Sequence, residues 1–193
     1  MAVLPQSPDP QWRPSAVLVC HPAAPCPAVH TLEATARLLD GHRLSVGFLL
    51  RGDLDRLRLP GPGALRRTDR LWEHTCFEAF LATPGQDPYW ELNWSPSTEW
   101  AAYGFERYRE RGGPVAGIEP HLVVHRSQGR LELHAVAALG GLATDLGLQV
   151  GLSAVIESLD GQLSHWALRH APGRPDFHHR ASFALELGPG AQA

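Results

Sequence analysis

The sequence has little that would indicate a disulfide-stabilised, metal-binding or secreted protein. Its three cysteines, Cys20, Cys26 and Cys76, form an odd set without CxxC spacing. Neither a disulfide framework nor a zinc site is expected, and the reducing cytoplasm is the predicted location. Residues 1–14 also lack a basic start followed by an apolar stretch, so a secretory signal is not expected.

Charge is also scarce. Charged residues make up 19% of the 193 residues and the formal net charge is −3, which argues against a general electrostatic attraction to nucleic acid or to an anionic membrane. No apolar run approaches the roughly 18 residues that suggest a membrane span. With 44% hydrophobic residues, the chain has the composition of an ordinary globular domain. We therefore expect neither a nucleic-acid nor a membrane partner, and the sequence does not indicate an oligomeric state.

Motifs for cofactors and covalent catalysis are missing. There is no GxGxxG, P-loop or GxSxG sequence. The eleven histidines show no HExxH, HxH or Cys/His spacing, and the adjacent His178 and His179 would point in opposite directions from an extended segment. Haem commonly takes His with Met or two His, and the only methionine is Met1. We therefore predict no cofactor, haem included, although ligation of haem by two histidines stays open.

The dominant pattern is an alternation of apolar and polar or small residues with period two, which is typical of β-strands. Turn sequences separate the runs: PGQDP at 84–88, SQG at 127–129 and LDG at 159–161. The pattern predicts an all-β fold, an antiparallel, jelly-roll-like β-sandwich with about ten strands and little helix. The expected strands are 31–38, 43–50, 53–59, 71–82, 89–95, 100–108, 119–126, 130–138, 148–157, 162–169 and 181–187.

Composition divides the chain into a Pro-rich N-terminal arm and lead-in over residues 1–29, one β-sandwich domain over 30–187 and a flexible tail over 188–193. Residues 139–147, LGGLATDLG, can hold one helical turn. The segment TEWAAYGFERYR, starting at Thr98, fits either a short helix or a strand. We assign a strand, because SPST at 95–98 is turn-forming and aromatic residues favour strands.

The stretch LWEHTCFEAFLATPGQDPYWELNWSP, residues 71–96, mixes large aromatics with carboxylates and amides in one predicted hairpin. Alternation puts Trp90, Leu92 and Trp94 on the core face, and the residues between them on an outer or concave face. Aromatic rings beside carboxylates and amides are typical of sugar sites, in which rings stack on the sugar and polar groups bind its hydroxyls. The predicted ligand-binding residues are His74, Glu78, Tyr89, Glu91, Asn93, Trp100, Tyr103 and Arg107, with Arg109 as an alternative to Arg107.

Three segments resemble the bacterial DOMON-like domain proteins: LWEHTCFEAFL, YWELNWSPSTEWAAYGFERYR and HWALRHAPGRPDFHHRASFALEL. This group is related to the family-nine carbohydrate-binding modules and to the haem- or sugar-binding DOMON domains. The resemblance spans about residues 30–187 and implies a β-sandwich with a ligand-binding role. Many DOMON relatives are secreted or membrane-associated, a location that this sequence does not indicate. The PDFHHR segment is a signature of the group, and either a ligand contact or latching of the last strand explains it.

The sequence thus predicts a non-catalytic module that binds a carbohydrate or related polyol on a polar and aromatic sheet face. One alternative is a scaffold or interaction domain without a small ligand, which should have a flat, filled sheet face and an exposed edge strand or apolar patch as its working surface. The polar residues of the hairpin can also form cross-strand pairs on a solvated sheet face. A glycoside hydrolase using Glu78 and Glu91 is a second alternative, and a haem-binding domain is a third.

Overall fold

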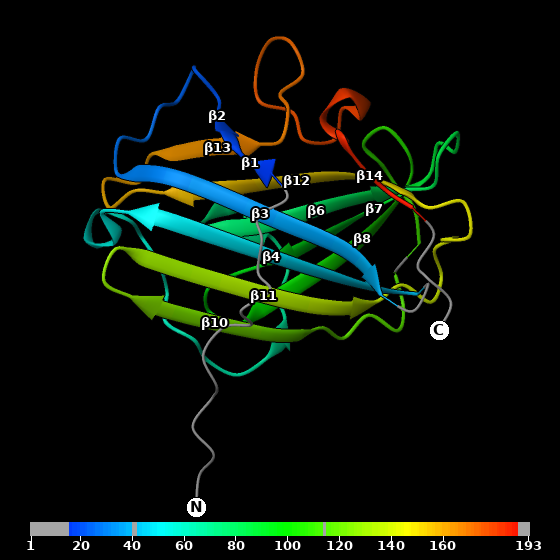
Figure 1. The fold of residues 1–193 in the computed structure, drawn as a ribbon, viewed down its shortest axis with the longest axis horizontal. Coiled ribbons are helices and arrows are strands. Elements are labelled where there is room, and N and C mark those ends of the chain that lie inside the picture. The colour runs from blue at the N-terminus through cyan, green and yellow to red at the C-terminus, as the bar shows by residue number, and fades with distance from the viewer. Residues whose placement is uncertain (1–15, 40–41, 114, 189–193) are drawn as a thin grey trace, which may run out of the picture.

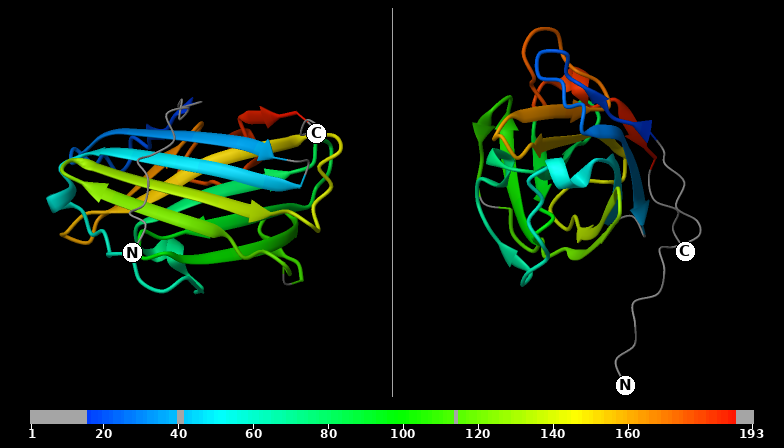
Figure 2. Two further views of the ribbon diagram at one scale, coloured as in Figure 1. Left: turned by 60° about the horizontal axis from the view of Figure 1, so that its bottom comes forward. Right: turned by 90° about the vertical axis from the view of Figure 1, so that its left-hand side faces the viewer.

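The computed structural model describes residues 16–39, 42–113 and 115–188, which fold into two facing β-sheets (Figure 1). The predicted arm before residue 16 and most of the predicted tail, residues 189–193, lie outside the described residues. Figure 2 shows the two sheets as the layers of a sandwich. Pairing is antiparallel except where β5 (Arg66–Arg67) lies parallel to β8 (Glu99–Arg107). The antiparallel β-sandwich predicted from the sequence is confirmed.

The smaller sheet has five strands and the larger sheet nine. Of these fourteen strands in the described residues, four have only two residues each, so the longer strands agree with the expected number of about ten. The smaller sheet has the order β1 (Ala16–Val17), β3 (Val29–Leu39), β4 (Arg43–Gly52), β11 (Arg130–Ala138), β10 (His121–Ser127). The larger sheet has the order β2 (Val19–Cys20), β13 (Leu163–Ala167), β12 (Leu148–Glu157), β6 (Cys76–Ala82), β7 (Tyr89–Trp94), β8, β5, with β14 (Leu185–Leu187) beside β12 and β9 (Glu110–Arg111) beside β8.

The turn sequences connect the strands that they were expected to connect. PGQDP joins β6 to β7, SQG joins β10 to β11, and LDG lies between β12 and β13. The segment from Thr98 forms the strand β8 rather than a helix. Residues 139–147 contain turns but no helix. None of the helices in the described ranges is long and apolar enough to cross a membrane.

The predicted strand 53–59 is wrong, because a 3-10 turn and one isolated bridge at Leu57 stand in its place. The predicted strands 71–82 and 181–187 are wrong over their first residues, because single 3-10 turns replace extended chain. These turns are η1 (Leu54–Arg56), η2 (Leu71–Glu73) and η3 (Arg180–Ser182). At η2 the backbone of Arg70 has the left-handed φ of 66°, and the amide of His74 donates to the carbonyl oxygen of Leu71. The turn buries the side chain of Leu71, and apolar alternation alone does not distinguish such a turn from a strand.

The main core lies between the two sheets and is built from alternate residues of each strand. Phe48 of β4 contacts Phe77 of β6 across the sandwich, with ring centroids 5.1 Å apart. Leu92 and Trp94 are fully buried in this core, and Trp90 packs against it half-buried. The core face predicted for the second strand of the hairpin is therefore the one observed.

The opposite face of the larger sheet is also buried, so the alternative of a solvated sheet face is wrong. A second apolar cluster covers it, and the loop of residues 168–184 between β13 and β14, here called the C-terminal loop, packs on that cluster (Figure 1). Phe80 lies 6.4 Å from Phe177 and 5.9 Å from Phe183, measured between ring centroids. Close packing requires Gly151 on β12, where an added Cβ would lie 3.1 Å from the carbonyl oxygen of Ser182.

Residues 16–29, expected only as a lead-in, take part in the fold. β1 pairs with β3, β2 pairs with β13, and Leu18 between them is buried in the main core. The packed unit therefore begins before residue 30, although the sequence-based domain division as such stays a prediction.

Candidate functional site

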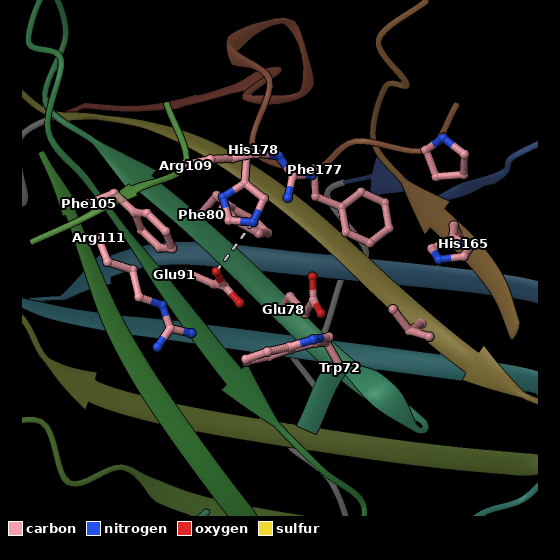
Figure 3. A pocket seen from close by; sticks show the side chains of 12 residues that line it. Trp72, Glu78, Phe80, Glu91, Phe105, Arg109, Arg111, His165, Phe177 and His178 are labelled. Atoms are coloured by element: carbon pink, nitrogen blue, oxygen red, sulfur yellow. Dashed lines mark ion pairs between the residues drawn. The ribbon is translucent and has the colours of Figure 1, made fainter. Parts of the chain in front are cut away.

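A cavity of about 450 Å³ opens on the outer face of the larger sheet, beneath the C-terminal loop (Figure 3). Its volume falls within the usual range for small-molecule sites. Strands of the sheet form its floor, and β9 and the C-terminal loop supply further walls. The lining residues are Trp72, Glu78, Phe80, Glu91, Phe105, Arg109, Arg111, Val155, His165, Pro175, Phe177 and His178.

Two carboxyl groups, those of Glu78 on β6 and Glu91 on β7, face this one cavity (Figure 3). The strands pair so that Glu78 lies opposite Asn93 and Glu91 lies opposite Phe80, which makes the two glutamates diagonal neighbours. Glu78 is 2% exposed and Glu91 is 5% exposed. Such burial of two like-charged groups is costly unless a proton or a ligand compensates for it.

The surroundings of the two carboxyl groups differ, and so does their affinity for a proton. Burial, and next the negative charge of Glu91, raise the pKa of Glu78 well above its ordinary value, against a hydrogen bond from Ser153. Burial also raises the pKa of Glu91, but a hydrogen bond from Asn93 and the positive charges of two arginines oppose the shift. Glu78 therefore holds a proton under conditions in which Glu91 is ionised.

The aromatic wall next to the carboxyl groups begins with Trp72, a half-buried ring that borders the open space below Glu78 (Figure 3). Its ring stands edge-on to that of Tyr103, with centroids 5.5 Å apart. The guanidinium of Arg111 lies over both rings, 5.8 Å from the centroid of Trp72 and 4.3 Å from that of Tyr103. These contacts hold the indole in place beside the polar floor.

Asp176 organises the C-terminal loop where it meets the cavity. It accepts hydrogen bonds from the hydroxyl of Tyr108 at 2.5 Å, from the guanidinium of Arg109 at 2.9 Å and from the amide of His178 at 3.1 Å. Arg109 itself has the left-handed φ of 57° at the turn between β8 and β9. Asp176 thereby ties this turn to the loop that carries His178.

His178 connects the loop to the floor. Its Nδ1 lies 2.9 Å from the hydroxyl of Tyr89, and its Nε2 lies 3.7 Å from Oε2 of Glu91. Burial, and next the positive charge of Arg109, lower the pKa of His178 to about 4, so its imidazole is neutral at pH 7. Because the Tyr89 oxygen already accepts from the amide of Arg109, its proton is available to Nδ1, which leaves the imidazole proton on Nε2 facing Glu91.

Of the residues predicted from the sequence, the structure brings Glu78 and Glu91 into the cavity and places three more directly behind it. Tyr89 supports His178, Asn93 donates to Oε1 of Glu91 at 2.7 Å, and Tyr103 backs Trp72. All three are buried, so they position lining groups rather than line the cavity themselves.

The other three predicted residues do not gather at this cavity. His74 follows the η2 turn and pairs with Glu157 outside the cavity, at 2.8 Å. Trp100 packs against the core between the sheets, because it lies on the opposite face of β8 from Ala101, Tyr103 and Phe105, which belong to the outer apolar cluster. Arg107 is exposed and pairs with Glu110, since the register of β8 and β9 shifts between residues 105 and 107.

Several lining residues were missed by strand alternation because they come from β9, β13 and the C-terminal loop: Arg111, His165, Pro175, Phe177 and His178. The PDFHHR segment was the available signal, since it contains three of them. Arg109, the alternative to Arg107, lines the cavity.

A wider groove of about 880 Å³ lies beside His74, but its carboxylates already have partners within the chain. Glu99 accepts from Arg66 at 2.6 Å, and Glu73 pairs with Arg70. Within the described residues, no group of three or more His, Cys, Asp or Glu side chains is arranged to hold a metal ion. The cavity of Glu78 and Glu91 is therefore the candidate site.

The chain matches no model of a known protein family, and no curated protein matches it. Among solved structures it resembles a presumptive carbohydrate-binding protein from Bacteroides uniformis, with a TM-score of 0.55, 15% identity, and coverage of 82% of this chain and 78% of that one. It also resembles a family-9 carbohydrate-binding module from Caldicellulosiruptor kristjanssonii solved with glucose, with a TM-score of 0.53, 11% identity, and coverage of 97% and 91%. At these identities the comparison shows a shared fold.

Proposed function

We propose that this chain is a carbohydrate-binding module whose ligand occupies the cavity of Glu78 and Glu91. The observation that carries the proposal is the meeting of these two buried carboxyl groups with the Trp72 ring in a cavity of about 450 Å³. A sugar needs both kinds of surface, because its C–H face is apolar and its hydroxyls are donors and acceptors.

Each lining group has a role in this proposal. Trp72 stacks on the sugar ring, ionised Glu91 accepts hydrogen bonds from hydroxyls, and protonated Glu78 can donate one. The guanidinium of Arg111 offers a fork of donors at the edge of the same space. Because each hydrogen bond replaces one to water, we expect micromolar to millimolar affinity, roughly 4–8 kcal/mol.

The shared fold supports the proposal, since one of the similar structures is a module in complex with glucose. Membership of the bacterial DOMON-like group is a finer proposal that rests on the three sequence segments quoted above. The cytoplasmic location likewise stays a prediction from the sequence.

The alternatives make different predictions. The scaffold was expected to have a flat, filled sheet face, and the observed cavity favours a ligand instead. A glycoside hydrolase gains one argument from the unequal pKa shifts of Glu78 and Glu91, since a general acid and an ionised partner are what hydrolysis requires. Release of reducing sugar from oligosaccharides would establish that activity. A stoichiometric Soret band in the purified protein would establish haem binding, which we do not expect.

The proposal is tested by calorimetric titration with glucose, cellobiose and related sugars. We expect binding by the native protein, loss of binding in Trp72→Ala and Glu91→Gln, and unchanged binding in the control His74→Ala. If no sugar binds, or if the His74 variant loses binding while the Trp72 variant keeps it, the proposed site is wrong.

A further inference from the structure

The charges around the cavity do not balance when both glutamates are ionised. Glu78, Glu91 and Asp176 carry carboxyl groups, whereas Arg109 and Arg111 carry the positive charges. Arg109 is matched by Asp176, with 2.9 Å between guanidinium nitrogen and carboxylate oxygen. Arg111 alone then faces two carboxylates, so the site lacks one positive charge.

The neighbouring titratable groups do not supply that charge. His178 has a pKa of about 4, and burial, then the charges of two other histidines, lower the pKa of His165, so both imidazoles are neutral at pH 7. The pKa of the Tyr89 hydroxyl and that of the Cys76 thiol are raised by burial, which keeps both groups uncharged. In the empty protein a proton on Glu78 restores the balance.

Hydrogen-bond donors are scarce at the same place. Glu78 accepts only from the hydroxyl of Ser153, at 3.3 Å, among the hydrogen bonds of the described residues. Asn93, directly opposite Glu78 in the strand pair, uses its amide nitrogen on Glu91, and its Oδ1 is buried without a partner. The floor therefore offers acceptors in excess of donors.

We propose that the sugar bound here carries a primary ammonium group, which lies between Glu78 and Glu91 and takes the place of the proton on Glu78. The inference rests on the proposed function and narrows it to amino sugars. An ammonium is a compact group that supplies one positive charge and three N–H donors. Positive charge and hydrogen-bond donors are the two features that the floor lacks.

The walls suit the same group. The rings of Phe80, Phe105 and Phe177 line the same cavity, on the side of the two carboxyl groups opposite Trp72 (Figure 3). Aromatic faces attract ammonium ions and strengthen their pairing with carboxylates by excluding water. A neutral sugar, by contrast, brings hydroxyl donors but no positive charge, so the proton would stay on Glu78.

The test is isothermal titration calorimetry at pH 6.5 with D-glucosamine, D-glucose and N-acetyl-D-glucosamine. Simple amines are still mostly protonated at this pH. The three sugars share one ring, but only glucosamine carries a cation. Titrations in phosphate and in MOPS, which differ in ionisation enthalpy, measure the protons released. We expect glucosamine to bind at least about tenfold more tightly than the other two and to release protons on binding.

Glu78→Gln is the decisive variant, because glutamine imitates the protonated carboxyl and cannot pair with a cation. It should bind glucosamine no better than glucose, whereas the control Glu186→Gln, at an exposed position of β14, should keep the preference. If glucose and N-acetylglucosamine bind as tightly as glucosamine and no proton is released, the ammonium is ruled out and the sugar site stands. If none of the three binds, both the site and the ammonium are contradicted.

Discussion

The hydroxyl of Tyr89 and Nδ1 of His178 lie 2.9 Å apart and join strand β7 to the C-terminal loop. The contact fixes the tautomer of the imidazole and aims Nε2 at Glu91. It therefore ties a loop of residues 168–184 to a carboxyl group in the floor of the sheet. Through this contact, the C-terminal loop acts as a wall of the site as well as a cover for apolar residues.

The first prediction concerns the titration of His178. Its pKa is about 4 in the folded protein and should be near 6.5 in the unfolded chain. Between these values the unfolded state binds more protons, so the free energy of unfolding falls as the pH drops from about 6.5 to about 4. The shift corresponds to at most about 3 kcal/mol.

Nuclear magnetic resonance of the ring protons measures this pKa directly, and chemical denaturation across the pH range measures its effect on stability. The difference between the native protein and His178→Asn isolates the contribution of this residue from that of the glutamates. A His178 that titrates near 6.5 in the folded protein would contradict the buried, neutral imidazole.

The second prediction concerns Glu78, whose effect has the opposite sign. Its pKa is raised in the folded state, so the folded protein holds the proton more tightly than the unfolded chain does. The free energy of unfolding should therefore decrease as the pH rises above the ordinary value of 4.5 toward the folded pKa. Glu78→Gln lacks the ionisation and should be more stable than the native protein at pH 8, where the difference is largest.

Glutamine at this position can keep the hydrogen bond from Ser153 and present an amide to the unpartnered Oδ1 of Asn93 opposite. Denaturation at pH 5 and pH 8, with Glu186→Gln as the control, checks this prediction. An equal loss of stability with rising pH in the native protein and in Glu78→Gln would show that Glu78 is not the protonated group.

The third prediction concerns Asp176. Asp176→Ala removes the acceptor shared by Tyr108, Arg109 and the amide of His178. We expect faster hydrogen exchange in the C-terminal loop, about 1–3 kcal/mol lower stability and weaker sugar binding. Glu110→Ala is the matched control, because it removes a carboxylate whose ion pair with Arg107 is exposed. Unchanged exchange in residues 168–184 would mean that other contacts hold the loop.

The fold was predictable from the sequence because its determinants are local. Period-two alternation and the turns at 84–88, 127–129 and 159–161 each act within a few residues of the chain. Alternation also placed Glu91 and Asn93 on the side opposite Leu92 and Trp94, as the structure has them.

The complete cavity was not predictable in the same way, because it depends on segments distant in sequence. Alternation within β7 does not reveal that a loop more than eighty residues later covers Tyr89. It also missed the η2 turn, which ends directly before His74, a residue that lies outside the cavity. It missed as well the register shift that turns Arg107 away while Arg111 reaches the cavity. Both are set by tertiary packing, which overrides local patterns.

The central claim, that a sugar stacks on Trp72 in this cavity, is tested most directly by tryptophan fluorescence during sugar titration. Among the described residues, Trp72 is the only tryptophan that lines the cavity, whereas Trp100 packs against the main core. We predict that the sugars found to bind by calorimetry change the emission of the native protein and of Trp100→Phe with the same affinity, and leave that of Trp72→Phe unchanged. A saturable change that persists in Trp72→Phe with unaltered affinity would contradict the account.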